Sequence, residues 1–274
     1  MDLKLAGASV LITGGSRGIG FALARGFVGE GARVAICARD QTRLDAAVAE
    51  LNAMGTQAVG IQTDLFKPED CAKAVERTVA AFGRLDVLVN NASTNVDKTP
   101  KSLEDATDEQ VLERFMGKTL GAIRCTRAAL PHLRAAGSGR IVCIGGMAAR
   151  AVQRGAERPG AGSGLPQGLG NAGLANFVKY ISEEGAADGI VANIVHPSLT
   201  RTERHAGRME RKASTQGISI AAAEAETASH FPIGRVPGPE DIVPLVLLLS
   251  SPLAGAITGQ AIAVDGGASR AIMY

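Results

Sequence analysis

The amino-acid sequence predicts an α/β fold in which one doubly wound parallel sheet carries helices on both faces. Short apolar runs rich in β-branched residues alternate with longer segments of helical period, which is the pattern of successive βαβ units. Only 3% of the residues are aromatic and Trp is absent, so an aliphatic core is expected, as suits a buried parallel sheet. The alternation continues along residues 1–274, which predicts a single domain.

Six strands are expected along the chain, at 9–13, 33–37, 85–90, 140–145, 190–196 and 261–265. Two segments interrupt the alternation. Residues 146–166 are rich in Gly, Arg and Pro and are expected to form a long irregular loop. Residues 198–237 begin with a charged helical stretch and are expected to form a lid over the substrate. Both follow the carboxyl ends of predicted strands, where sheets of this kind bind ligands.

Charge and hydropathy argue against two classes of partner. The 29 basic and 27 acidic residues give a formal charge of +2 with no basic block, which disfavours nucleic acid. The first residues lack a secretory leader, and the run "IVPLVLLLSSPLAGAI" is too short to span a bilayer. We therefore expect a soluble cytoplasmic protein with no membrane partner. Four widely spaced cysteines in apolar segments are expected to be buried, reduced thiols without a metal: Cys37, Cys71, Cys125 and Cys143.

The first strand runs directly into "TGGSRGIG" at 13–20 and then into an apolar helix. Glycines let the backbone turn sharply toward a pyrophosphate, while the helix N-terminus offers unpaired N–H groups and a positive dipole end. This strand–turn–helix context predicts a dinucleotide site. The residues expected to contact the cofactor here are Gly14, Ser16, Arg17, Gly18, Ile19 and Gly20.

The end of the second strand, "VAICARD", indicates which dinucleotide is bound. A carboxylate that accepts the ribose hydroxyls would signal NAD, but the chain places Ala38 and then Arg39 at this point. Together with Arg17, Arg39 could grip a 2′-phosphate. The pattern favours NADP, and Asp40 close behind leaves NAD as the alternative.

The motifs "TGGSRGIG", "TDL" at 63–65, "NNAS" at 90–93, "GRIVCIGG" at 139–146 and "HPSLTRT" at 196–202 resemble the short-chain dehydrogenase/reductase family, in order along nearly the whole chain. The resemblance implies a Rossmann-like fold and a nicotinamide cofactor. Ser198 stands where the family usually has Gly. Six further cofactor contacts follow from the resemblance: Asp64 and Leu65 beside the adenine, Asn90 and Ala92 on the ribose side, and Pro197 and Thr202 toward the nicotinamide or pyrophosphate.

The resemblance also locates the catalytic positions. Members of the family usually employ a Tyr acid, a Lys one helical turn later, a Ser that polarises the carbonyl and an Asn that anchors a relay water. Counted along this sequence, these positions hold Gln167, Asn171, Gly146 and Lys118, so all four residues differ from the usual set. An amide cannot release a proton, and the Tyr–Lys mechanism is therefore excluded.

Replacement groups can be named. Lys118, as a cationic acid or anchor, and His196, at the end of a strand, are the leading candidates, each weighed against a structural role. Tyr180 would need another register, with too little helix before the next strand. Ser93, Asp97 and Ser163 are weaker candidates. Basic residues that either clamp an acidic substrate or form a solvated surface are Arg150, Arg154, Arg158, Arg201, Arg204, His205, Arg208 and Arg211.

Two functions follow from these observations. The first is an NADP(H)-dependent oxidoreductase with a non-standard catalytic set, acting on a small carbonyl or alcohol. The alternative is a redox-silent nucleotide-binding subunit, or a non-redox enzyme such as an isomerase or cyclase. The resemblance further implies a homo-oligomer, a tetramer or dimer, with the helices around 107–135 and 167–187 at its interfaces.

Overall fold

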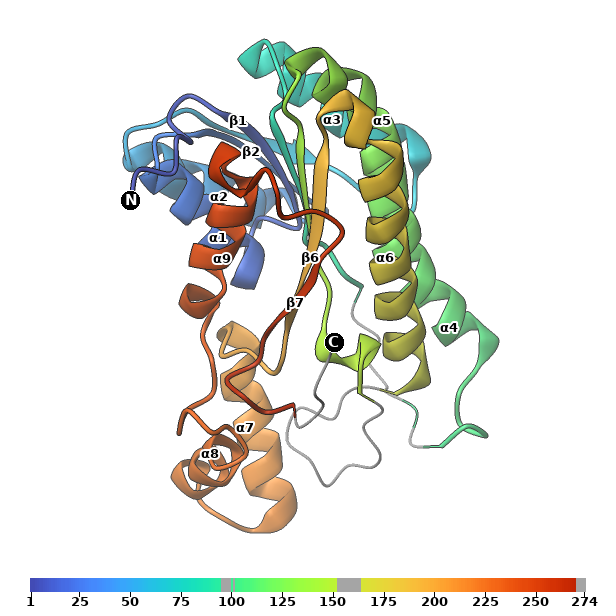
Figure 1. Cartoon of the computed structure of the whole chain (residues 1–274). Coiled ribbons are helices and arrows are strands. Elements are labelled where there is room, and N and C mark those ends of the chain that lie inside the picture. The colour runs from blue at the N-terminus through green and yellow to red at the C-terminus, as the bar shows by residue number, and fades with distance from the viewer. Residues whose placement is uncertain (95–99, 101, 152–163, 270–274) are drawn as a thin grey trace.

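The computed structural model describes residues 1–94, 100, 102–151 and 164–269. These residues form a seven-stranded parallel sheet of order β3-β2-β1-β4-β5-β6-β7, which confirms the predicted fold class (Figure 1). The order reverses between β1 and β4, and a crevice opens at such a switch point. The strands are β1 (Ser9–Thr13), β2 (Arg33–Ala38), β3 (Ala58–Gln62), β4 (Val87–Asn90), β5 (Arg140–Ile144), β6 (Val191–Pro197) and β7 (Ala261–Val264).

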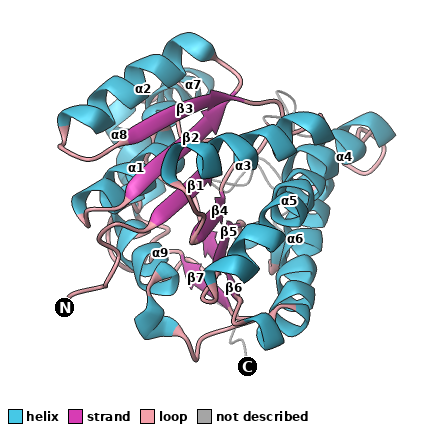
Figure 2. Cartoon of the chain, turned by 90° about the horizontal axis from the view of Figure 1, so that it is seen from above, coloured by secondary structure: helices cyan, strands magenta, loops and turns pink. Residues whose placement is uncertain are grey.

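Helices cover both faces of the sheet (Figure 2). On one face α1 (Gly18–Gly29), α2 (Gln41–Ala53) and α9 (Val243–Ser250) enclose an aliphatic core. On the other, α3 (Pro68–Phe82), α5 (Gly121–Ala136) and α6 (Leu165–Glu184) enclose a second one. Both layers are built mainly from Ala, Val, Ile and Leu, as the composition predicts, and the second also contains the four cysteines.

The strand β3 was not predicted from the sequence, whereas the six expected strands appear within two residues of their predicted bounds. This short edge strand is only partly buried and contains Gly60. A Cβ at Gly60 would lie 2.9 Å from Leu44 Cγ and 3.0 Å from Val48 Cγ2, so α2 packs directly on the strand backbone there. Glycine removes the β-branched signal that marks a strand, which explains the omission.

The two irregular segments are more structured than the sequence suggests. The 146–166 segment begins with a short turn, η2 (Met147–Ala149), and α6 already starts at Leu165; residues 152–163 lie outside the described part. The 198–237 segment holds α7 (Glu203–Gln216) and α8 (Ile220–Ala228), which extend beyond the carboxyl ends of the strands (Figure 1). These two helices pack on each other through a small apolar cluster of their own.

All four cysteines are free and buried, as expected. Burial raises the pKa of the Cys37 and Cys143 thiols to about 12, so both are protonated at neutral pH. Within the described ranges, no helix combines the length and apolarity needed to cross a bilayer.

The first prediction concerns the glycine turn. A Cβ at Gly20, in the first turn of α1, would overlap the Gly14 carbonyl oxygen and the Asn91 amide nitrogen. Gly20→Ala should therefore lower the free energy of unfolding by about 1–3 kcal/mol, the usual range for overpacking. The matched control is Gly29→Ala in the same helix, where a Cβ meets nothing within 4 Å, and it should be neutral or stabilising by up to about 1 kcal/mol. Urea unfolding that finds the two variants equal would refute this account of the turn.

Candidate active site

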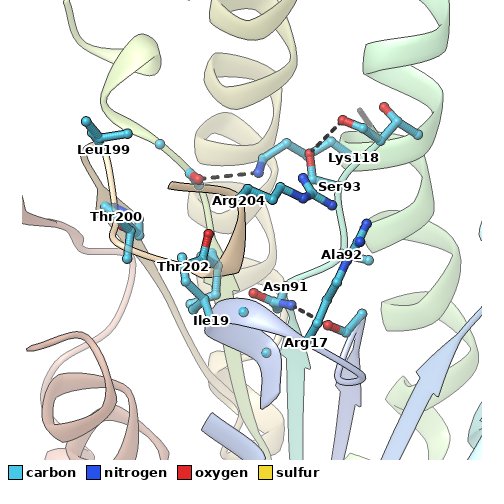
Figure 3. A pocket seen from close by; sticks show the side chains of 18 of the residues that line it. Arg17, Ile19, Asn91, Ala92, Ser93, Lys118, Leu199, Thr200, Thr202 and Arg204 are labelled. Atoms are coloured by element: carbon cyan, nitrogen blue, oxygen red, sulfur yellow. Dashed lines mark hydrogen bonds between the residues drawn. The ribbon is translucent and has the colours of Figure 1, made fainter. Parts of the chain in front are cut away.

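A cavity of about 1490 Å³ opens beyond the carboxyl ends of the strands, at the switch point. Its walls come from the glycine turn, the ends of β2 and β4, the segment after β5, the start of α6, and α7. Figure 3 shows Arg17 of the turn, Thr202 and Arg204 at the start of α7, and Lys118 arranged around this space. The volume is large enough for a dinucleotide together with a small substrate.

The glycine turn is fixed to β4 by the side chain of Asn91. Its Nδ2 donates to the carbonyl oxygens of Thr13 and Gly14, each at 3.0 Å. In return the Thr13 hydroxyl oxygen accepts from the backbone N–H groups of Asn91 and Ala92, at 3.0 and 3.1 Å. A Cβ at Gly14, whose φ is +68°, would lie 2.9 Å from Ala92 Cα, so only glycine fits this approach.

Asn90, predicted to line the ribose side, does not line the cavity. It is buried at the end of β4, where its Nδ2 donates to the Thr126 hydroxyl at 3.1 Å. Successive side chains of a strand point to opposite faces, so Asn91 is presented to the turn instead. Ala92 lines the cavity as expected, as do all six predicted residues of the glycine turn.

The N-terminus of α1 already holds an oxyanion. Glu203 Oε1, from the first residue of α7, accepts a hydrogen bond from the Gly18 backbone N–H at 3.3 Å. An anion is favoured there because the helix dipole and the unpaired N–H groups of the first turn both attract negative charge. The Gly18 N–H therefore already has an anionic partner within the chain.

Three arginines line the cavity from neighbouring elements: Arg17 in the glycine turn, Arg39 directly after β2, and Arg43 in the first turn of α2. Arg43 was missed from the sequence, because it reaches the cavity only through the first turn of α2. Asp40 also lies here, but it caps α2 by accepting the Arg43 N–H at 3.1 Å and pairs with the Arg43 guanidinium at 3.2 Å. Asp64 and Leu65 line the same region, as predicted.

The four predicted catalytic positions, Lys118, Gly146, Gln167 and Asn171, all line the cavity. Lys118 lies in a π-helical segment, η1 (Met116–Leu120), between α4 (Asp108–Phe115) and α5. The neighbouring Thr119 hydroxyl donates to the Gly170 carbonyl at 2.6 Å and so fixes η1 against the first turns of α6. A Cβ on Gly146 would lie 3.1 Å from Asn171 Nδ2, which places these two positions side by side.

Lys118 is a buried cation that donates one hydrogen bond within the described residues. Its side-chain Nζ donates to the Gly145 carbonyl at 3.3 Å, directly beside the predicted Ser position (Figure 3). Burial, followed by the positive charge of nearby Arg114, lowers the pKa of Lys118 to about 7. At neutral pH the group therefore exchanges readily between ammonium and amine.

Two other candidate acids are not in the cavity lining. His196 is fully buried under the segment after β5, where its Nδ1 accepts from the Gly146 N–H at 3.1 Å. Burial, followed by the positive charges of Arg150 and Lys118, lowers the pKa of His196 to about 4. The imidazole is therefore neutral at pH 7, and by accepting from Gly146 it anchors the segment after β5. Tyr180 is 62% exposed, and its hydrogen bond with Glu184 raises its pKa.

The predicted lid residues divide into two groups. Arg204, His205 and Arg208 of α7 line the cavity, whereas Arg201 pairs with Glu240 at 3.6 Å. Of the remaining candidates, Ser93, Pro197 and Thr202 line the cavity. Arg150 donates a hydrogen bond to the Ala261 carbonyl, and Arg211 is exposed. The candidates outside the described residues are Asp97, Arg154, Arg158 and Ser163. Among the described residues there is no His, Cys, Asp and Glu group able to hold a metal.

A family model described as "Enoyl-(Acyl carrier protein) reductase" matches residues 14–269. The chain belongs to the short-chain dehydrogenase/reductase family. Among relatives, it is 30% identical to the short-chain reductase protein NovJ of Streptomyces niveus over 257 residues, which cover 94% of this chain and 92% of NovJ. It is 35% identical to a tropinone reductase homologue of Arabidopsis thaliana over 268 residues, covering 97% and 92% of the two chains.

Solved structures agree with this assignment to the short-chain dehydrogenase/reductase family. The L-sorbose reductase of Gluconobacter frateurii, solved in complex with NADPH and L-sorbose, superposes with a TM-score of 0.91 at 29% identity. The match covers 99% of this chain and 100% of the sorbose reductase.

The burial of Lys118 predicts a pH dependence of stability in this short-chain dehydrogenase/reductase. Its pKa is about 7 in the folded state against 10.5 for an ordinary Lys, so between these pH values the unfolded state binds more protons. Stability from this group therefore rises with pH across that window and is lowest below pH 7. Lys118→Met should raise the free energy of unfolding at pH 7 by a few kcal/mol, at about 1.4 kcal/mol per pKa unit, and should flatten the rise.

Urea unfolding at pH 6 to 9 measures this effect, and Lys73→Met on the exposed face of α3 serves as the control. Parallel pH profiles for wild type and Lys118→Met would contradict the buried-cation account.

Proposed function

We propose that this protein is an NADP(H)-dependent oxidoreductase that reduces the carbonyl group of a small molecule with a non-standard catalytic set. The observation that carries the proposal is the presence of Arg17, Arg39 and Arg43 in the wall of a dinucleotide-sized cavity. Three guanidinium groups suit a 2′-phosphate, and Asp40, the cavity carboxylate next to Arg39, is engaged as the cap of α2. The NADPH in the related sorbose reductase structure supports the same cofactor.

The described residues fit each part of this cofactor. The Gly18 N–H and the α1 N-terminus suit the pyrophosphate, in the place that the Glu203 carboxylate takes in this structure. Asn171 Oδ1 is buried without a hydrogen-bond partner among the described residues, and it can accept a ribose hydroxyl. When bound, the nicotinamide supplies the hydride, and the protein supplies position and a proton.

Lys118 is the proton donor in this proposal. It is the one side chain at the four catalytic positions that can release a proton, since Gln167 and Asn171 are amides and Gly146 has no side chain. The ammonium gives its proton to the carbonyl oxygen as the hydride reaches the carbonyl carbon, and the resulting amine is reprotonated from water. Its pKa of about 7 suits this role, because general acids work best near the operating pH.

The amides serve as positioning groups. Gln167 and Asn171 stand one helical turn apart on α6, so both side chains reach the same side of the cavity. An amide can donate to an oxygen and accept from a hydroxyl, which lets this pair orient substrate and ribose without a charge.

We also propose a homo-oligomer and a cytoplasmic location, as expected from the sequence. Large apolar side chains are exposed along α4 and α6, the helices expected at the interfaces. They are Leu112, Phe115, Leu165, Leu169 and Tyr180.

Cofactor selectivity tests the proposal. Fluorescence titration should show that NADPH binds at least tenfold more tightly than NADH. Arg39→Ala and Arg43→Ala should each raise the Kd for NADPH about tenfold or more, since a hydrogen bond to a charged group contributes about 1.5–3 kcal/mol. Neither change should alter the Kd for NADH more than about twofold.

Arg77→Ala, an exposed arginine of α3 outside the cavity, is the control for this titration and should bind both cofactors as wild type does. Equal Kd values for NADPH and NADH would overturn the choice of NADP, and no binding of either would overturn the proposed function.

The catalytic role of Lys118 gives a kinetic prediction. Lys118→Met should lower kcat for NADPH-dependent carbonyl reduction about 10²–10⁴-fold, the usual contribution of a general acid, with little change in the Kd for NADPH. Wild-type kcat should fall as the pH rises through about 7, because the ammonium form is the donor.

Tyr180→Phe is the matched control and should retain full activity across a panel of aldehydes, ketones and oxo acids. Loss of activity in Tyr180→Phe but not in Lys118→Met would assign the acid to Tyr180. Tight NADPH binding without any turnover in wild type would instead support the redox-silent alternative.

A further inference from the structure

The inner end of the cavity carries an excess of positive charge. Besides Lys118, its wall contains Arg114 of α4 and both Arg204 and Arg208 of α7. Arg204 and Arg208 stand one helical turn apart, so they share one face of α7. Besides burial, the like charge of Arg204 lowers the pKa of Arg114, and the like charge of Arg17 lowers the pKa of Arg204, so Arg204 lies near both residues.

The carboxylates of the cavity lining do not balance these cations. Among the described lining residues they are Asp40, Asp64 and Glu203. Asp40 pairs with Arg43, and Glu203 is hydrogen-bonded at the start of α1. Asp64 accepts from the Phe66 backbone N–H at 3.1 Å, near the adenine end. None of these three carboxylates forms an ion pair with Arg208.

Arg208 is a cation of the cavity wall without a paired carboxylate among the described residues. It is half-buried, and its pKa is lowered by burial and by the like charge of Arg211. Arg114, by comparison, donates to the Ser93 hydroxyl at 3.0 Å and to the Thr94 carbonyl. No ion pair joins Arg208 to another described residue. Withdrawing a guanidinium from water without a counter-charge is costly, so a bound anion would be stabilised here.

We propose that the substrate is an anionic carbonyl compound whose carboxylate or phosphate is bound by Arg208, and this rests on the proposed function. Arg208 lies one helical turn beyond Arg204 on α7. Besides burial, the like charges of Arg17 and Arg43 lower the pKa of Arg204, whereas neither acts on Arg208, which is therefore farther from these arginines assigned to the cofactor. Arg204 adds positive charge one turn away, and Lys118 faces the same cavity. The substrate is thereby held by its charged end, with its carbonyl free to meet Lys118.

The experiment compares charged and neutral forms of the same molecule. Levulinate is paired with methyl levulinate, and glycolaldehyde phosphate with glycolaldehyde, so the two pairs distinguish a carboxylate from a phosphate. Binding is measured by isothermal titration with NADP⁺ at saturation, which needs no turnover, and kcat/KM is measured with NADPH. At least one anion should bind tenfold or more tightly than its neutral partner and should be reduced correspondingly faster.

Variants of α7 identify the residue responsible. Arg208→Met should bring the Kd of the preferred anion to within about twofold of that of its neutral partner, and Arg208→Lys should restore part of the difference. Arg77→Met, at an exposed position of α3 outside the cavity, is the control and should behave as wild type.

Equal binding of charged and neutral forms in wild type, or an equal loss in Arg77→Met, would overturn the proposed anion site. If the protein nevertheless binds NADPH and reduces neutral ketones, only the anion site is refuted and the proposed oxidoreductase function stands. Anion binding that depends on Arg208 without turnover of any compound would instead support the site and count against the oxidoreductase.

Discussion

The side chain of Asn91 is the contact on which the geometry of this cavity depends. The amide of Asn91 donates hydrogen bonds to two carbonyl oxygens at the end of β1. The Thr13 hydroxyl oxygen accepts hydrogen bonds from two backbone N–H groups that follow β4. These bonds join the two strands where the sheet order reverses. The glycine turn, the direction of α1 and the oxyanion position at Gly18 all follow from that junction.

A second constraint is the burial of Lys118. The π-helical segment that carries it is a local departure from regular helix, and such departures occur often at functional sites. The hydrogen bond from Thr119 to Gly170 fixes the segment against α6, so the ammonium cannot withdraw easily to solvent. Burying the Lys118 ammonium lowers the stability of the fold, but it also presents an ionisable group to the cavity. Ionisable groups with shifted pKa values are typical of functional sites.

The sequence predicted the fold class, the glycine turn and the positions that line the catalytic end of the cavity, because these depend on local pattern and on order along the chain. Counting back along α6 correctly brought Gln167 and Asn171 to the cavity. Other features depend on side-chain direction or on contacts between distant segments. The contact predicted on the ribose side was Asn90, but successive side chains of a strand point to opposite faces, and it is Asn91 whose side chain faces the glycine turn.

The positions of the lid residues and of the candidate acids also depend on contacts between distant segments. The end of a strand does not reveal what covers a side chain there, and the segment after β5 covers His196. Arg43 and Arg208 line the cavity because helices α2 and α7 pack beside it, and the sequence alone does not show how these helices pack. The pairing of Arg201 with Glu240, 39 residues away, could not be anticipated from local charge patterning.

The most direct test of the account is a crystal structure of the protein with NADP⁺ and levulinate. We expect the carbonyl carbon to lie about 3.5 Å from the nicotinamide C4, with Lys118 Nζ within hydrogen-bond distance of the carbonyl oxygen and the levulinate carboxylate on Arg208. A nicotinamide ring placed away from Lys118, or another ionisable side chain in contact with the carbonyl oxygen, would contradict the proposed chemistry.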